Sequence, residues 1–383
     1  MPPTPDEGGH PVNVSTTGGS GEGLRVAVIG ATGNVGTSLL RALAADPAVA
    51  AVRGLARRVP DHAPDKTSWW PVDLGDPRPA AENALREALR GMDAVVHLGW
   101  LLQPARDPMI TWRTNVGGTE RVLRAVARVG VPAVLCASSV AAYTSGPPPS
   151  RRRDRPVVRE DASTHGRPTA AYSREKAYQE RLLDIFERDH PEVRVVRMRP
   201  AFLLKRESAS QQRRLFLGPF VPGGLLRPGL PPLLPNIPGL RLQVLHTDDA
   251  AEAWRLALHR PVRGAFNLAT DPVLDTRDLA NLLDTTPRTV PLPVVRAALT
   301  AAWTARLTPA SPALFDTMVR LPVMDCSRAR EELGWTPRRD ARQTVAALLS
   351  GLRDAAGGPT PPLRSRLPGG RAEELAKGPG RVP

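Results

Sequence analysis

The chain has 383 residues, of which 41% are hydrophobic, and its formal net charge is +14. Nearly all of its 52 basic residues are arginines scattered among alanines and prolines, and no aromatic residues interleave with the densest run, at 151–155, as a nucleic-acid stacking surface would need. The charge therefore predicts no nucleic-acid partner, and the length allows one core with a lobe beside it.

The cysteines and the apolar segments indicate the cellular location of the protein and whether it holds a disulfide or a metal. Cys136 and Cys326 are far apart in sequence and lack the spacing of metal ligands, so we expect neither a disulfide framework nor a zinc site. The N-terminus lacks a basic region followed by an apolar stretch, and no segment offers about 18 uninterrupted apolar residues. We expect a cytoplasmic protein with no membrane partner and no metal.

The two ends of the chain differ from its middle. Residues 1–23 are rich in Gly, Pro, Ser and Thr without periodic apolar positions, and residues 355–383 have the same character. Both ends are predicted to be disordered tails. The arginine run at 151–155 follows three prolines and is predicted to lie on a solvated loop.

Strand and helix patterns alternate through residues 24–200. Predicted strands at 24–30, 51–56, 68–73, 93–99, 133–139 and 193–199 alternate with predicted helices at 34–46, 80–91, 114–130 and 170–189. The strands are almost continuously apolar, as expected when helices cover both faces of a parallel sheet. The pattern predicts an α/β fold with a Rossmann-type doubly wound parallel sheet.

A second region follows residue 200. A strand at 241–246, a helix at 247–260 and a strand at 264–269 are expected to complete the core at about 241–270. Helical patterns recur at 276–283, 294–307, 311–319, 326–333 and 340–353. Residues 201–240 and 271–354 therefore predict a smaller, mostly helical C-terminal lobe that binds the substrate.

One segment of that lobe, residues 217–240, carries too many prolines for the interior of a regular helix or strand. We predict a loop there. Its apolar composition is unusual for a loop and favours a cover over a substrate, although the same residues could simply pack the lobe.

Three glycines, Gly30, Gly33 and Gly36, stand where the first predicted strand turns into the first helix. Such a turn lets backbone amides approach a pyrophosphate, and the helix N-terminus adds a partial positive charge. The spacing is not the common GxGxxG, and a glycine turn can be purely structural. Its place at the start of the alternating pattern favours dinucleotide binding, with Thr32, Asn34 and Val35 beside the same cofactor.

The end of the second strand bears on which dinucleotide binds. A carboxylate there binds the ribose hydroxyls of NAD, whereas an arginine binds the 2′-phosphate of NADP. Arg57 and Arg58 occupy this place, and the nearest acid, Asp61, lies beyond Pro60. Although arginine is common throughout the chain, this arrangement favours NADP(H) over NAD.

Tyr172 and Lys176 form a candidate catalytic pair on a predicted helix. Their four-residue spacing places them on one helical face, so the ammonium can lie near the phenol. A free phenol ionises near pH 10, and a nearby cation lowers that pKa. An ordinary amphipathic helix would also carry this spacing. Lys176 is, however, one of only four lysines, and Ser139 ends a strand expected to stop beside the cofactor.

At this point the chain resembles the extended short-chain dehydrogenase/reductase family, in its NAD-dependent epimerase/dehydratase group. The resemblance runs from about residue 24 to residue 354 and rests on landmarks in order. These are GATGNVG at 30–36, VDLGD at 72–76, VVHLGW at 95–100, NVGGT at 115–119, SSVAAY at 138–143, YSREK at 172–176, RP at 199–200, HTDDAA at 246–251, GAFNLA at 264–269 and EELGWTP at 331–337.

The resemblance implies roles for individual residues. Tyr172 would be the acid/base, Lys176 would lower its pKa and hold the nicotinamide ribose, and Ser139 would orient the reacting oxygen. His97 and His246 would serve packing or hydrogen bonding, and homodimers are common in the family. The residues implied at the cofactor include Asp73 at the adenine, Leu74, Leu98 and Gly99 along the cofactor, Asn115 supporting the bordering helix, and Pro200.

The reaction stays open between two enzymatic alternatives. One is a reductase or dehydrogenase acting on a small, largely apolar alcohol or ketone; the other is a nucleotide-sugar epimerase that recycles a tightly bound NAD. Val140-Ala141 replaces the Asp-Glu of family dehydratases, and the family's sugar-nucleotide Asn is missing after Arg199. The first departure argues against dehydration, and the second argues against a nucleotide-sugar substrate and so favours the reductase. A cofactor-binding regulator without catalysis is the third possibility, and the retained Tyr/Lys pair argues against it.

The substrate site is expected around the apolar segment. Phe202, Leu204, Phe216 and Phe220 are predicted to line an apolar cavity beneath it. Arg213 and Arg214 lie just upstream and offer the route by which a nucleoside diphosphate could be held instead.

Overall fold

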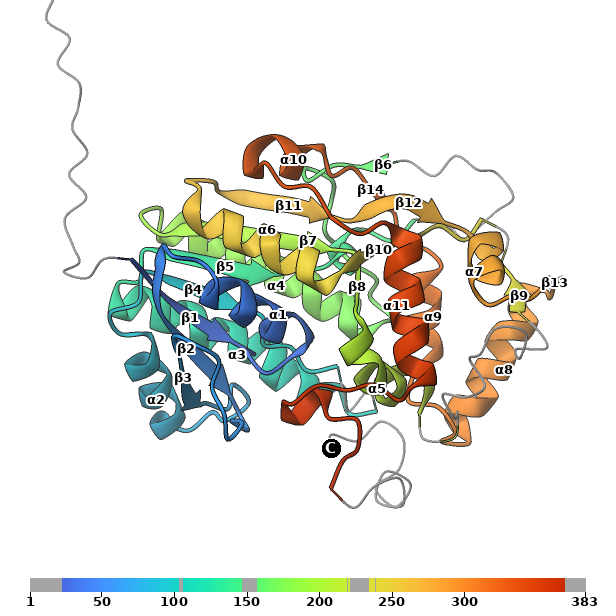
Figure 1. Ribbon diagram of the computed structural model, residues 1–383, viewed down its shortest axis with the longest axis horizontal. Helices are drawn as coiled ribbons and strands as arrows, with labels where there is room; N and C mark the ends of the chain where they lie inside the picture. Colours follow the sequence, from blue (N-terminus) through green and yellow to red (C-terminus); the bar gives the residue numbers. More distant parts are fainter. Residues whose placement is uncertain are drawn as a thin grey trace, which may run out of the picture.

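The computed structural model describes residues 23–102, 106–146, 157–218, 220, 234–237 and 239–368. Residues 1–22 and 369–383 of the expected tails, the arginine run at 151–155 and residues 221–233 of the apolar segment lie outside the described residues. Figure 1 shows a central sheet with helices on both faces and a second region, rich in helices, beside it.

Seven parallel strands form the central sheet, so the predicted Rossmann-type α/β class is confirmed. The strand order reverses between β1 and β4, which is where such sheets bind ligands. In sheet order the strands are β11 (Gly264–Leu268), β7 (Arg194–Pro200), β5 (Ala133–Ala137), β4 (Ala94–His97), β1 (Leu24–Ile29), β2 (Val49–Ala56) and β3 (Thr67–Pro71).

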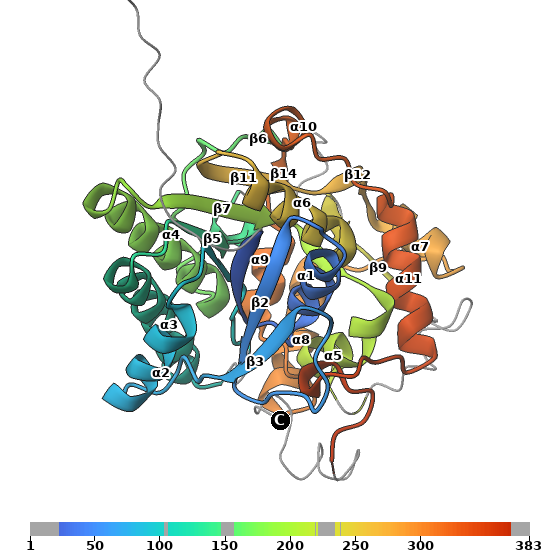
Figure 2. The same cartoon turned by 60° about the vertical axis from the view of Figure 1, so that its left-hand side comes forward.

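Each face of the sheet is covered by its own helices and buries its own apolar cluster. Helices α1 (Asn34–Ala44) and α6 (Thr247–His259) cover one face, and α2 (Pro79–Leu89), α3 (Pro108–Val129) and α4 (Ala171–Asp189) cover the other (Figures 1 and 2). Alternate residues of β1 enter opposite clusters: Val26 and Val28 pack with α1, whereas Ala27 and Ile29 pack with α3. Burial on both faces explains why the strands are continuously apolar.

The register of the strands brings four loops to one edge of the sheet. Ile29 pairs with His97, His97 with Cys136, and Ala137 with Met198. Since the strands are parallel, the chain leaves β1, β4, β5 and β7 at this edge. The glycine turn, Trp100 and Ser139 all follow directly from these strand ends.

Three small sheets lie outside the central one. Strands β8 (Phe202–Leu204), β10 (Leu242–His246) and β12 (Thr270–Leu274) form one, and the others are the pairs β9 (Leu234–Asn236) with β13 (Pro287–Thr289) and β6 (Val157–Val158) with β14 (Val323–Met324). Of the segment at about 241–270 that we expected to complete the core, β11 joins the central sheet and α6 covers one of its faces, whereas β10 pairs with β8 and β12 outside the central sheet.

The lobe is mostly helical, and every helix expected beyond residue 276 is present. Its helices are α5 (Ala209–Gln212), α7 (Thr276–Leu282), α8 (Leu292–Thr304), α9 (Pro312–Met318), α10 (Ser327–Leu333) and α11 (Ala341–Arg353). Short 3₁₀ turns occur at Val140–Ala142, Arg206–Ser208 and Pro361–Leu363, and a π-helix at Arg213–Leu217. Among the described helices, none combines the length and the apolarity needed to cross a membrane.

Part of the segment predicted as loop is a strand. Leu234–Asn236 pairs in parallel with β13 despite Pro235. A two-stranded sheet consists only of edge strands, where a missing amide donor can face away from the partner, so proline is tolerated.

The C-terminal region also differs from its prediction. We call residues 355–368 the C-terminal strap; this part of the expected disordered tail packs against the body of the protein. It contains a 3₁₀ turn at Pro361–Leu363, and the Leu363 side chain is only 1% exposed. The proline- and glycine-rich composition indicated disorder. The strap is nevertheless ordered, because a single buried leucine and a few backbone hydrogen bonds anchor it.

Candidate active site

The glycine turn is shaped by two close approaches of the backbone. Gly30 has φ of +80°, and a Cβ there would lie 2.7 Å from the amide nitrogen of Gly99. A Cβ at Gly36 would lie 2.4 Å from the carbonyl oxygen of Gly30. Both positions therefore require glycine, and the first turn of α1 packs against the end of β1 with its N-terminus directed at this edge of the sheet.

The neighbours of the glycines have contacts that the sequence did not indicate. The Asn34 side-chain amide donates to the carbonyl of Leu203 at 3.0 Å, which ties α1 to β8. The carbonyl of Thr32 accepts a hydrogen bond from Thr360, and Val35 packs partly buried against α1's core cluster. Asn34 therefore has a structural role in addition to the cofactor contact that is expected of it.

The residues expected along the adenosine lie where the order of the strands predicts. Arg57 and Arg58 follow β2 directly and are exposed. Asp73 follows β3, and its carboxylate accepts the Gly75 amide at 2.8 Å. Leu74 is buried beneath Gly99, where an added Cβ would lie 3.2 Å from its Cδ1, and Leu98 packs partly buried against the cluster on the other face of the sheet.

The three expected catalytic residues converge at the end of β5. Ser139 begins the short turn after this strand, while Tyr172 and Lys176 lie in the first turns of α4. The Ser139 side chain lies close enough to the Tyr172 hydroxyl to lower the pKa of the phenol. The Ser139 hydroxyl also accepts the Ala141 amide at 3.1 Å, which fixes its direction.

Lys176 is buried, and three groups surround its ammonium. It donates to the Ala137 carbonyl at 2.6 Å and to the Gln179 side chain at 3.1 Å, and it lies 3.3 Å from the centroid of the Trp100 ring. Burial lowers the pKa of Lys176 to about 7, and the nearby acidic groups oppose that shift only in part.

The pKa of Tyr172 differs from the expectation that Lys176 lowers it. Burial raises the pKa of the phenol, the Ser139 hydrogen bond opposes this, and the Glu175 carboxylate raises it further. The Lys176 ammonium faces Trp100 instead, whose ring also meets the Tyr172 ring edge-on at a centroid distance of 6.1 Å. Trp100 therefore contacts both members of the pair, a role that the sequence did not indicate.

Asn115 supports the site from α3. Its amide donates to the buried carboxylate of Glu175 at 2.6 Å, and its oxygen accepts the Leu101 amide at 2.7 Å. Thr111 donates to the same carboxylate at 2.6 Å. Asn115 thus joins α3, α4 and the loop after β4, which agrees with its expected support of the bordering helix.

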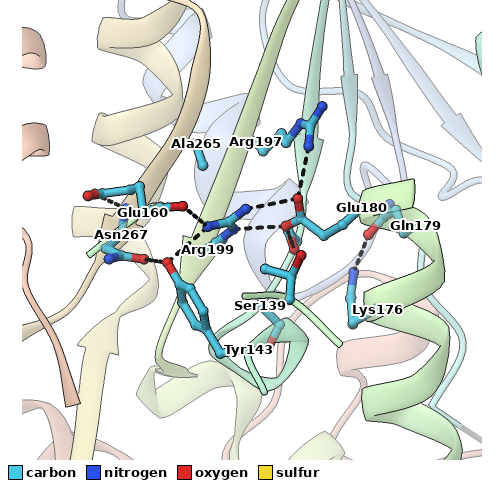
Figure 3. A network of polar contacts seen from close by, with 12 residues as sticks. Ser139, Tyr143, Glu160, Lys176, Gln179, Glu180, Arg197, Arg199, Ala265 and Asn267 are labelled. Carbon is cyan, nitrogen blue, oxygen red and sulfur yellow. Dashed lines mark hydrogen bonds and ion pairs between the residues drawn. The ribbon is translucent and has the colours of Figure 1, made fainter. Parts of the chain in front are cut away.

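A buried ionic network begins at Glu180 on α4, one turn beyond Lys176 (Figure 3). Glu180 receives two hydrogen bonds from Arg199, at 2.8 and 3.0 Å, and one from the Ser138 hydroxyl at 2.6 Å. Burial alone would raise the pKa of Glu180, but the hydrogen bond and charge of Arg199 hold it down at about 2.

The network continues along β7 and across to β11. Arg197 contacts Glu180 at 3.2 Å, and Arg199 donates to the Tyr143 hydroxyl at 3.0 Å. Tyr143 in turn donates to Asn267 on β11 at 2.7 Å. Ser138, next to Ser139, is thereby held by charges on α4 and β7. The sequence offered one signal, the Arg199-Pro200 landmark, of which only Pro200 had been assigned a role, at the cofactor.

The two histidines have the packing roles that were expected. His97 is buried and contacts the Thr119 hydroxyl at 3.1 Å, and burial lowers its pKa to about 3. His246 accepts the Asp248 amide at 3.2 Å and caps α6.

The predicted substrate residues are not gathered in one place. Phe202 packs against the apolar cluster that Tyr172 also contacts, and both Phe202 and Leu204 pack into the lobe against β10 and α11. Phe216 is partly buried, and Phe220 is 51% exposed. The guanidinium groups of Arg213 and Arg214 donate to the carbonyls of Gly218 and Pro362. Pro200 ends β7 opposite Leu268.

Comparison of sequences places this arrangement among known proteins. The model of the NAD dependent epimerase/dehydratase family matches residues 26–269. An uncharacterized protein of Sinorhizobium fredii is 28% identical over 69% of this chain and 64% of its own length. The NAD-dependent glucose-6-phosphate dehydrogenase of Haloferax volcanii is 30% identical over 41% of this chain and 59% of its own length. The match therefore spans less than two thirds of either relative.

Comparison of structures finds the same fold. The UDP-glucose 4-epimerase of Thermus thermophilus, solved in complex with NAD, is similar over 87% of this chain and 100% of its own, with a TM-score of 0.62. Its sequence identity is 20%, so the likeness concerns the fold.

Proposed function

The chain belongs to the NAD dependent epimerase/dehydratase family, and from this premise we propose that it is an NAD(P)-dependent enzyme in which Tyr172 and Lys176 assist hydride transfer at a secondary alcohol or ketone. One observation carries the proposal: Ser139, Tyr172 and Lys176 converge at the sheet edge that also holds the glycine turn.

The residues at that edge fit a dinucleotide. A Cβ at Gly30 or Gly36 would collide with backbone atoms, so these glycines let the first turn of α1 pack closely on β1 and bring its N-terminus to the place where a pyrophosphate would bind. Gly30, Gly33 and Gly36 would hold the pyrophosphate, Asp73 the adenine, and Lys176 the nicotinamide ribose. When bound, the nicotinamide supplies or accepts the hydride.

The chain's own residues handle the proton. The Tyr172 hydroxyl donates a proton to the carbonyl oxygen in reduction and takes one from the alcohol in oxidation, while Ser139 orients that oxygen. Because burial raises the pKa of Tyr172, a cation is needed near the phenol for proton exchange at neutral pH. Lys176 can provide it when its ammonium turns from Trp100 towards the phenol.

We favour NADP(H) as the cofactor. Two exposed arginines and no carboxylate follow β2, which suits a 2′-phosphate better than free ribose hydroxyls.

We favour a reductase or dehydrogenase acting on a small, largely apolar substrate. Phe202 packs in the cluster of Tyr172, so an apolar wall adjoins the phenol. Arg213 and Arg214, the candidates for holding a diphosphate, already donate to backbone carbonyls. The second candidate, a nucleotide-sugar epimerase, draws its support from the structural likeness to a UDP-glucose 4-epimerase.

We also propose a homodimer through α3 and α4. Met109 and Ile110 on α3 and Tyr178 and Ile185 on α4 are all exposed apolar side chains, at 42–65%. The Trp112 and Tyr178 rings contact each other at a centroid distance of 4.9 Å, tilted by 58°, and join the two helices into one surface. A second copy would cover this surface, and sedimentation of Ile185→Glu should then give monomers where the wild type gives dimers.

Calorimetry on the NADPH-loaded protein separates the two reactions. We would titrate UDP, dTDP, GDP and a panel of apolar ketones, and follow NADPH oxidation with each ketone. Binding and turnover of an apolar ketone supports the reductase. Micromolar binding of a nucleoside diphosphate that Arg213→Ala abolishes would establish the epimerase instead, and a protein that binds NADPH but turns over neither class would be a regulator.

A further inference from the structure

The C-terminal strap is anchored to the glycine turn. The Thr360 hydroxyl donates to the Thr32 carbonyl at 2.8 Å, and both side chains are buried. Within the strap, the Gly358 amide donates to the Leu363 carbonyl at 2.7 Å and closes a compact loop around the buried Leu363. The position of residue 364 is therefore fixed relative to the turn.

The anchoring places the strap beside the end of β2. The Gly30 amide donates to the Leu55 carbonyl at 2.9 Å, so the glycine turn lies against the last residues of β2, and Arg57 and Arg58 follow within three positions. Figures 1 and 2 both show the dark red strap running next to the blue loops at this end of the sheet.

Three arginines lie near this place: Arg57, Arg58 and Arg364. Burial and then the positive charges of Arg57 and Arg364 lower the pKa of Arg58, so both charges lie close enough to act on Arg58. All three side chains are exposed to solvent and so accessible to a ligand.

This cluster lacks the acidic partners that other arginines have. Nearby, Arg206 pairs with Asp354 at 3.0 Å, and Arg41 pairs with Asp248 at 2.8 Å. Over the residues that the structure describes, no carboxylate lies within pairing distance of Arg57, Arg58 or Arg364. Three uncompensated cations repel one another, and a dianion that accepts several charge-assisted hydrogen bonds would relieve this.

We propose that Arg364 completes, with Arg57 and Arg58, a binding site for the 2′-phosphate of NADP(H), and that the C-terminal strap is one wall of this site. The proposal rests on the proposed use of NADP(H) and adds to it a residue more than 300 positions away from β2. The ligand chemistry is a phosphate monoester on a ribose, and Arg364 contributes a third cation that neither the glycine turn nor β2 provides.

The test compares Arg364→Ala with Arg366→Ala, an exposed arginine two residues further along the same strap. Calorimetry would measure the binding of 2′,5′-ADP, 5′-ADP and inorganic phosphate to each variant. We expect Arg364→Ala to weaken 2′,5′-ADP about tenfold and to leave 5′-ADP unchanged, with Arg366→Ala like the wild type. Arg364→Gln should repeat the result, and circular dichroism would verify that both variants fold.

A second variant tests the strap itself. Thr360→Val removes the hydrogen bond to Thr32 while keeping the shape of the side chain, and it should weaken 2′,5′-ADP several-fold. In the wild type, 2′,5′-ADP but not 5′-ADP should slow proteolysis within the strap.

The outcomes separate this inference from the function on which it rests. If the wild type prefers 2′,5′-ADP to 5′-ADP and Arg364→Ala keeps the full preference, Arg364 has no part in the site although NADP(H) use stands. If the wild type shows no preference, both the NADP(H) assignment and this inference are wrong. Equal binding of inorganic phosphate and 2′,5′-ADP would indicate a free-phosphate site and also overturn the inference.

Discussion

The ammonium of Lys176 lies 3.3 Å from the centroid of the Trp100 ring, and the same ring meets Tyr172 edge-on. Trp100 lies in the loop after β4, whereas Lys176 and Tyr172 lie on α4. The contact therefore joins this loop to α4 at the edge of the sheet that also holds the glycine turn. The ring face offers the buried ammonium an attraction that partly replaces water.

The first prediction concerns the stability of Lys176→Met. The pKa of Lys176 is about 7 in the folded protein and about 10.4 when unfolded, so its charge destabilises the fold fully below pH 7, and this cost disappears as the pH approaches 10. Urea unfolding should show that Lys176→Met has a higher free energy of unfolding than the wild type. This gain should be larger at pH 6 than at pH 9, by on the order of 2 kcal/mol. A difference that does not change with pH would contradict the burial argument.

The second prediction concerns Trp100→Leu. The ring stabilises only the protonated lysine, so its loss should cost stability mainly where the lysine is charged, by ~1 kcal/mol more at pH 6 than at pH 9. Trp70→Leu, where Arg53 lies 5.0 Å from the ring centroid, provides the control, because an arginine stays charged throughout this range. Identical pH profiles for the two variants would count against the contact.

A third prediction follows from the arginines after β2. Arg57→Ala combined with Arg58→Ala should weaken NADPH at least tenfold and NADH less than about twofold, since a charge-assisted contact is lost only with the phosphate. Fluorescence titration measures both, and Arg128→Ala on the exposed side of α3 is the control. If the affinities for NADPH and NADH fell equally, the preference for NADP(H) would be wrong and NAD would be the cofactor.

The fourth prediction concerns the network in Figure 3. Glu180→Gln leaves the buried Arg199 and Arg197 with less compensating charge and should cost about 3 kcal/mol at pH 7. Because the pKa of Glu180 is lowered to about 2, its contribution is present above about pH 4.3 and is lost as the pH falls towards 2.

The matched control is Glu120→Gln, which removes an exposed pair with Arg124 at 2.6 Å and should cost less than about 1 kcal/mol. If the two variants lost equal stability at pH 7 in urea unfolding, Glu180 would not hold Ser138 and α4 in the way described.

Local sequence patterns predicted the parts of the site that depend on neighbours in the chain. Gly30 and Gly36 follow from a turn between a strand and a helix, and Tyr172 and Lys176 follow from helical spacing. The strand order then brought Ser139 to the same edge, since parallel strands share their carboxyl ends.

The remaining contacts join residues far apart in the chain, and no local pattern encodes them. Thr32 and Thr360 are 328 positions apart, and the proline-rich composition around Thr360 indicated disorder. The local sequence patterns around Arg199 and Glu180 are also compatible with exposed charged side chains. The partner of Lys176 could not be predicted because Trp100 lies in a loop whose path depends on packing against α3 and α4.

The most direct test of the proposed acid/base role is the turnover of Tyr172→Phe, measured as NADPH oxidation with the apolar ketones together with cofactor affinity by titration. The ring stays and only the hydroxyl is removed, so cofactor affinity should stay within a few-fold while less than about a tenth of the turnover remains. Tyr178→Phe, exposed on the same helix, should keep wild-type turnover. Turnover of Tyr172→Phe above about a tenth of the wild-type value would mean that Tyr172 is not the acid/base.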